Sequence, residues 1–211
     1  MKFPINEMIV DHHFVDEVIE IGDDLPKGLL SCTLERCHLI ISVKSGGPSI
    51  YRSKLVDCMI DVKKKMRDTR LPKFFDADYV RCKFIGHFSG VDFGRSPRPN
   101  PLTGEMDKYG EMIDCDFTEA TLDMCRFFNV DITKQKFAPW PQFVIPYANK
   151  LQASKLPREW PGKFGNHMRL VPRQNPALVA TTGTVKDYLK EYAITLDELE
   201  QILDAIGGVI R

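Results

Sequence analysis

Residues 115–137, CDFTEATLDMCRFFNVDITKQKF, decide the fold. Large apolar side chains recur at every fifth place of this stretch, namely Phe117, Leu122, Phe127, Ile132 and Phe137. Two places before each of them stands a second set: Cys115, Ala120, Cys125, Val130 and Gln135. All of these except Gln135 are small or medium apolar residues. A period of five fits neither the 3.6-residue period of a helix nor the two-residue period of a strand.

The same spacing marks all six cysteines of the chain. A large apolar residue follows each cysteine two places later, in the pairs Cys32 and Leu34, Cys37 and Leu39, Cys58 and Ile60, Cys82 and Phe84, Cys115 and Phe117, and Cys125 and Phe127. This pattern predicts a solenoid with sides of about five residues, each directing one large and one small side chain inward. Because cysteine behaves as a small buried hydrophobe, we expect six reduced thiols stacked inside it.

These units resemble those of the pentapeptide-repeat proteins, written A/C-D/N-L/F-x-x. The resemblance covers residues 32–137 and implies a mainly β fold, a short irregular right-handed four-sided β-helix of about four coils. A basic segment at 63–76 and a proline-rich segment at 95–111 interrupt the runs. We expect both to be excursions, since proline cannot donate to an inner hydrogen-bond ladder. The alternative is a mixed α+β domain in which the spacing is accidental.

The flanking segments are expected to cover the ends of the solenoid. Residues 1–31 predict an N-terminal cap, because apolar residues between Phe14 and Ile19 recur at helix-like spacing. Residues 138–182 hold both tryptophans and many prolines, which predicts an extended wrap with little regular structure.

The last segment, 183–211, predicts a helical hairpin. Thr184 is placed to cap a first helix, and Thr195 with Glu198 forms a capping-box pattern before a second one that stops at Gly207. The second helix carries four carboxylates and no basic residue before Arg211, so we interpret the hairpin as a packing element rather than a DNA reader.

Composition and charge exclude several classes of function. The 211 residues carry 29 basic and 29 acidic side chains, and this balance argues against a general nucleic-acid binder. No secretory signal and no bilayer-spanning apolar run are visible, so we expect a cytoplasmic protein without membrane contact.

The sequence offers no assembled catalytic, cofactor or metal motif. His12 and Asp16 share a spacing compatible with a metal pair, but only two ligands are local, and we interpret them as surface residues. The cysteines fall at inward positions, His38 at an outward one, and His87 at a one-residue slip of the repeat. We therefore predict no catalytic residues, no metal and no cofactor.

The favoured function is a non-enzymatic protein-binding role. By analogy with small pentapeptide-like proteins, we expect an immunity protein that binds and neutralises a cognate bacterial toxin domain. The residues expected to face that toxin are an acidic set and a basic set: Glu17, Glu20, Asp23, Asp24, Lys63, Lys64, Lys65, Arg67 and Arg70.

Two other functions stay open. One is a DNA mimic that modulates topoisomerases, which the zero net charge and the basic segments disfavour. The other is a small enzyme whose cleft is lined by Trp140, Trp160, His167 and Arg169.

Overall fold

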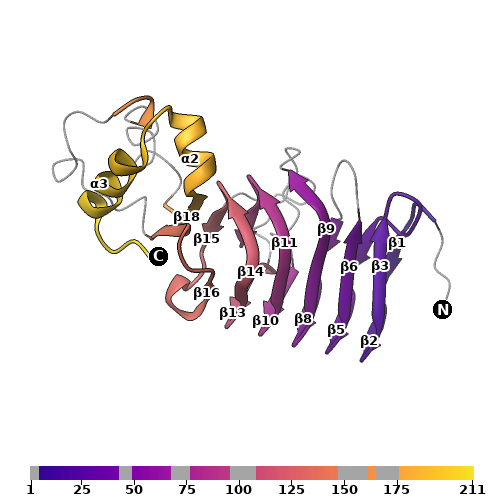
Figure 1. Ribbon diagram of the computed structural model, residues 1–211. Helices are drawn as coiled ribbons and strands as arrows, with labels where there is room; N and C mark the ends of the chain where they lie inside the picture. The colour runs from indigo at the N-terminus through magenta and orange to yellow at the C-terminus, as the bar shows by residue number, and fades with distance from the viewer. Residues whose placement is uncertain (1–4, 43–48, 68–76, 96–107, 147–160, 165–175) are drawn as a thin grey trace.

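A computed structural model describes residues 5–42, 49–67, 77–95, 108–146, 161–164 and 176–211. Short strands lie side by side in a stack that starts near the N-terminus and ends beneath two helices (Figure 1). Neighbouring strands of the stack pair in parallel, and each pairing joins segments that lie far apart in the chain. This arrangement is a parallel β-solenoid, as the five-residue period predicts.

The described residues form five successive coils, each contributing three strands. The strands, coil by coil, are β1 (Met8–Val10), β2 (His13–Val15) and β3 (Val18–Gly22); β4 (Gly28–Leu30), β5 (Thr33–Glu35) and β6 (His38–Ser42); β7 (Ser49–Tyr51), β8 (Ser53–Val56) and β9 (Met59–Arg67); β10 (Ala77–Val80), β11 (Lys83–Ser89) and β12 (Asp92–Gly94); and β13 (Met112–Ile113), β14 (Asp116–Asp123) and β15 (Arg126–Phe128). About four coils were expected within residues 32–137, and the structure adds a further one in residues 8–22.

Two sheets run through all five coils. We call them the short-strand sheet (β2, β5, β8, β10, β13) and the long-strand sheet (β3, β6, β9, β11, β14, then β16, Lys136–Phe137). In the long-strand sheet, Leu39 lies between Ile19 and Ile60, and Phe84 pairs with Ile60. Every side chain of this inner ladder is buried, so each coil completes the core of its neighbour.

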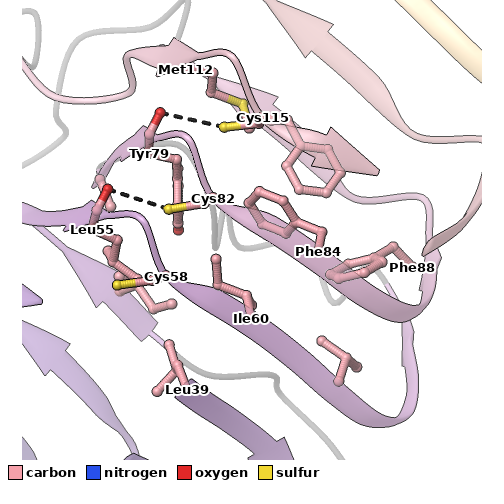
Figure 2. Close-up of a cluster of buried hydrophobic side chains, with 14 of the residues drawn as sticks. Leu39, Leu55, Cys58, Ile60, Tyr79, Cys82, Phe84, Phe88, Met112 and Cys115 are labelled. Carbon is pink, nitrogen blue, oxygen red and sulfur yellow. Dashed lines mark hydrogen bonds between the residues drawn. The ribbon is translucent and has the colours of Figure 1, made fainter. Parts of the chain in front are cut away.

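All six cysteines lie in the core, as predicted, and are reduced. Five thiols donate to a carbonyl of the preceding coil; for example, Cys82 Sγ lies 3.3 Å from Leu55 O and Cys115 Sγ 3.4 Å from Tyr79 O (Figure 2). Burial raises the pKa of Cys115 and of Cys125 to about 12. The thiols of Cys115 and Cys125 are therefore neutral near pH 7 and serve as packing groups.

Phenylalanine rings fill the later coils. Phe117 stacks between Phe84 and Phe137, with ring centroids 4.5 Å and 5.6 Å apart and interplanar angles of 12° and 8°. Phe93 and Phe127 form a second stack at 5.1 Å. Identical rings one coil apart meet in this way because parallel pairing brings equivalent residues into register.

One corner of the solenoid carries an alternating column of charge. Asp16, Arg36, Asp57 and Arg81 each precede the long-strand sheet with φ between 51° and 56°, a conformation that non-glycine residues rarely adopt. Arg36 binds both carboxylate oxygens of Asp16 at 2.7 Å, and Arg81 binds those of Asp57 at 2.6 and 2.7 Å. Both pairs are exposed, so water screens them and they add little to stability.

The N-terminal segment corrects one expectation. Residues 8–22 form the first coil of the solenoid rather than a helix-spaced cap over residues 1–31. Ile9, Phe14 and Ile19 do follow the five-residue period and are buried. His12 and Glu17 occupy the positions where later coils carry cysteine, and these polar residues concealed the repeat.

The first interruption differs from the expected bounds, whereas the second lies between β12, which ends at Gly94, and β13, which begins at Met112, as expected. Strand β9 continues through the expected start of the excursion at residue 63 and ends at Arg67. Residues 68–76, the remainder of the first segment, and residues 96–107 of the second lie outside the described residues.

The segment expected as a wrap contains two paired strands. β17 (Gln142–Pro146) runs antiparallel to β18 (Leu178–Thr184), which in turn runs antiparallel to β15 of the last coil. The expectation of little regular structure therefore fails for these strands, while residues 147–160 and 165–175 lie outside the described part of the chain. The antiparallel addition ends the parallel stack at this side.

The two predicted helices follow β18. α2 (Val185–Tyr192) is capped by Thr184, and α3 (Leu196–Ile206) begins with the capping box formed by Thr195 and Glu198 and ends at Gly207. They share a second apolar cluster with β17, in which Phe143 and Tyr188 meet edge to face at 4.8 Å.

Candidate functional site

The acidic set lies on the first coil, at the end of the stack farthest from the helices (Figure 1). Glu17, Glu20 and Asp24 are exposed, and within the described ranges none of the three forms an ion pair. Asp23 is half-buried. The sequence assigned these carboxylates to one surface, and three of them do present free charge there.

Exposed valines accompany these carboxylates. Val18 is 65% exposed on β3, Val10 is 45% exposed on β1, and Val15 is 39% exposed on β2. In a parallel solenoid an outward apolar side chain gains nothing from the core, so it is available to a partner. The first coil thus combines negative charge with apolar contact area. We call this surface, defined by Val10, Val15, Glu17, Val18 and Glu20, the first-coil face.

Two lysines of the basic set form ion pairs within the protein. Lys63 Nζ lies 2.5 Å from the Asp61 carboxylate, and Lys65 Nζ lies 3.7 Å from that of Asp123. Lys64 is exposed on β9. The side chain of Arg67 and the whole of Arg70 lie outside the described residues. The structure therefore separates the two charge sets: the carboxylates face solvent, and two of the lysines neutralise buried aspartates.

The long-strand sheet widens where these lysines lie. β9, β11 and β14 each have seven or more residues, against five in β3 and β6. The pairing of β11 with β9 shifts register between Gly86 and Phe88. Gly86 has φ +107°, and a Cβ there would lie 2.2 Å from Val62 O, so the bulge requires glycine. His87 is the residue that this bulge carries.

A cluster that the sequence did not reveal lies beside this bulge. Ligating atoms of His87 on β11, Asp123 at the end of β14 and Asp187 in the first turn of α2 all lie within 4.8 Å of one another. The slip in the repeat at His87 was the one sequence signal near it. The two aspartates come from distant segments, so no local spacing could have joined them.

Hydroxyl groups orient both carboxylates of the cluster. Ser89 Oγ donates to Asp123 Oδ2 at 2.9 Å, and Thr184 Oγ1 donates to Asp187 Oδ2 at 2.7 Å. Asp123 is only 7% exposed, and its Oδ1 has no hydrogen-bond partner among the described residues. A buried, incompletely paired carboxylate is costly, which marks this cluster as a place for a cation.

The negative charge of Asp123 contributes to the raised pKa values of two tyrosines of α2, Tyr188 and Tyr192. Burial raises the pKa of Tyr188, and the neighbouring Tyr192 and the Asp123 carboxylate raise it further. The pKa of Tyr192 is raised to about 12, first by burial and then by the charges of Glu191 and Asp123. Both phenols therefore stay neutral beside the aspartate.

Of the other sequence candidates, those that the structure describes are not assembled into a site. His12 lies near Val10 O at 3.5 Å, whereas Asp16 is bound by Arg36, so the potential metal pair is not formed. Trp140 is exposed and lies beneath the Arg211 guanidinium at 5.8 Å. Trp160, His167 and Arg169, the rest of the expected cleft, lie outside the described residues.

The chain matches no protein-family model and no curated protein. Within the described residues, neither helix has the length and apolar character needed to cross a bilayer. The function therefore has to be argued from the solenoid and its surfaces.

Proposed function

We propose that this protein is a non-enzymatic binding protein of the pentapeptide-repeat type that acts as an immunity protein, capturing a cognate bacterial toxin domain on its first-coil face. The observation that carries the proposal is the combination of unpaired carboxylates and exposed valines around the three strands of the first coil. Such a face suits a partner that presents cationic side chains around an apolar centre.

The charge distribution favours the acidic set over the basic set as the docking surface. Between residues 5 and 24 the chain carries acidic side chains and no lysine or arginine. Lys63 and Lys65, in contrast, are already paired with Asp61 and Asp123. A partner that recruited these lysines would first have to separate them from buried carboxylates, which costs free energy.

The stacked coils make the face rigid. Because each coil packs against the next through buried ladders, the outward side chains of β1–β3 are presented in a fixed arrangement. A preorganised surface loses little conformational entropy on binding, which suits tight capture of one partner. The toxin as partner rests on analogy with small pentapeptide-like immunity proteins.

The test is binding to the toxin-domain candidate encoded beside this gene, measured by surface plasmon resonance. The double variant Glu17→Lys and Glu20→Lys should associate at least about tenfold more slowly at low salt, because electrostatic steering is reversed. The matched control is Glu200→Lys, an exposed glutamate on α3, which should bind as the unmodified protein does. Unchanged association of the double variant would refute docking at this face.

A further inference from the structure

We propose that His87, Asp123 and Asp187 bind one divalent transition-metal ion, which joins the long-strand sheet to α2. This site is separate from the first-coil face, and the proposal does not depend on the proposed function.

The three side chains converge from three elements. Their ligating atoms lie within 4.8 Å of one another. Around a tetrahedral ion with bonds of about 2.1 Å, donor atoms lie roughly 3.4 Å apart, so side-chain rotations that bring the atoms at most about 1.4 Å closer complete the site. The bulge at Gly86, the end of β14 and the first turn of α2 fix the three backbones in this arrangement.

Asp123 supplies an independent indication that a cation belongs here. Its side chain is nine-tenths buried, and Oδ1 has no hydrogen-bond donor among the described residues. Lys65, the cation that the structure places nearest, lies 3.7 Å away on the side of Oδ2. A metal ion bound at Oδ1 would satisfy this atom and offset the cost of burying the carboxylate.

The donor set indicates the class of ion. One imidazole and two carboxylates suit Zn²⁺, Co²⁺ or Mn²⁺, whereas Ca²⁺ and Mg²⁺ prefer oxygen ligands alone. Ser89 and Thr184 act as outer-shell donors, because each holds one carboxylate oxygen and leaves the other for the ion. Three protein ligands leave at least one coordination position for water.

The bound ion would fasten the helical hairpin to the solenoid. His87 and Asp123 belong to the fourth and fifth coils, while Asp187 belongs to α2. The site would thus add a link between the stacked coils and α2.

The test begins with the full-length protein stripped of metal by a chelator. Titration with Co²⁺ should produce the visible absorption of a nitrogen- and oxygen-ligated ion at one equivalent, and Zn²⁺ should displace it. Asp123→Asn should weaken Co²⁺ binding at least about hundredfold, and Ser89→Ala about tenfold. The matched control is Asp61→Asn, since Asp61 is also 7% exposed on the same sheet but pairs with Lys63 and His38. The control should leave binding unchanged.

Amide hydrogen exchange of α2 gives a second readout. Zn²⁺ should slow exchange in α2 of the unmodified protein and leave it unchanged in His87→Gln, a variant that also tests the site if Asp123→Asn does not fold. Either of two results would overturn the proposal: no saturable Co²⁺ signal in the unmodified protein, or equal Co²⁺ affinity in the unmodified protein, Asp123→Asn and His87→Gln.

Discussion

The two ends of the solenoid are built differently. At the C-terminal end, buried polar side chains replace the coil that would come next: Gln135 Oε1 accepts from Cys115 N at 2.9 Å, Gln142 Oε1 from Leu122 N at 2.6 Å, and Thr182 Oγ1 from Cys125 N at 3.1 Å. At the N-terminal end, the strands of the first coil pair on one side only, within the described residues.

Within the described residues, backbone N–H groups of the last coil are hydrogen-bonded by side chains, whereas the strands of the first coil leave one edge unpaired. Backbone N–H groups that lack a partner inside a protein cost about 1–3 kcal/mol each, so the closed end supplies an acceptor for them. Unpaired strand edges in water have no such cost but attract other chains, which proteins often prevent with charge. Glu17 and Glu20 are exposed at this edge, and their negative charge favours the cationic partner that we propose.

The largest difference in stability between the two ends should come from removing buried aromatic side chains. Phe117→Ala removes a fully buried ring that lies between Phe84 and Phe137, and we expect the free energy of unfolding to fall by about 3–5 kcal/mol. Phe14→Ala in the first coil should cost less, about 2–3 kcal/mol, because an end coil can relax around the cavity. Urea denaturation of both variants measures the two values, and a larger loss for Phe14→Ala would contradict the comparison.

The next effect is a loss of stability at alkaline pH. The pKa of Cys125 is about 12 in the folded protein, above its ordinary value of 9.0. Below pH 9.0 the thiol is neutral in both states; between that pH and about 12 the unfolded chain loses the proton first, so unfolding becomes easier as pH rises. The contribution is about 1.4 kcal/mol per pH unit.

Cys125→Ala isolates this contribution. Urea denaturation between about pH 9 and 11 should show a shallower fall in unfolding free energy for the variant than for the unmodified protein. Cys37→Ala, near the open end, should change the slope less, since burial raises the pKa of Cys37 by a smaller amount. Equal slopes in Cys125→Ala and the unmodified protein would show that this thiol is not buried as described.

A smaller effect tests the polar closure directly. Thr182→Val keeps the shape of a fully buried side chain but removes the acceptor of the Cys125 N–H, and we expect a loss of about 1–2 kcal/mol. Thr121→Val, at an exposed position of β14, should change stability by less than about 0.5 kcal/mol. Calorimetric melting compares the two, and equal losses would deny Thr182 a closing role.

The smallest effect on stability belongs to the open end. Glu20→Lys should alter the unfolding free energy by less than about 0.5 kcal/mol, because the side chain is exposed and forms no ion pair among the described residues. A loss above about 1 kcal/mol would assign Glu20 to the fold rather than to a docking surface.

The sequence predicted the features that depend on a repeated pattern or on neighbouring residues. The five-residue period around Phe117 predicted the core ladder and the buried thiols, and Thr184, Thr195 and Glu198 predicted both helix starts, because caps act within one turn. The first coil was missed because His12 and Glu17 stand where later coils have cysteine.

Features that depend on distant segments were not accessible in this way. Gln142 and Thr184 pair across a long stretch of chain, so a proline-rich composition concealed the β17–β18 ladder. The cluster of His87, Asp123 and Asp187 forms only when the fourth coil, the fifth coil and α2 meet. Neither spacing nor composition carries that information.

Hydrogen–deuterium exchange of the native protein tests the contrast between the two ends most directly. Amides of β3 in the first coil should exchange at least about tenfold faster than those of β14 in the fifth. β3 pairs only with β6, whereas β14 pairs with β11, with β16 at Asp116 and Phe117, and through Leu122 N with Gln142 Oε1. Equal or slower exchange in β3 would contradict an open first coil and the docking surface assigned to it.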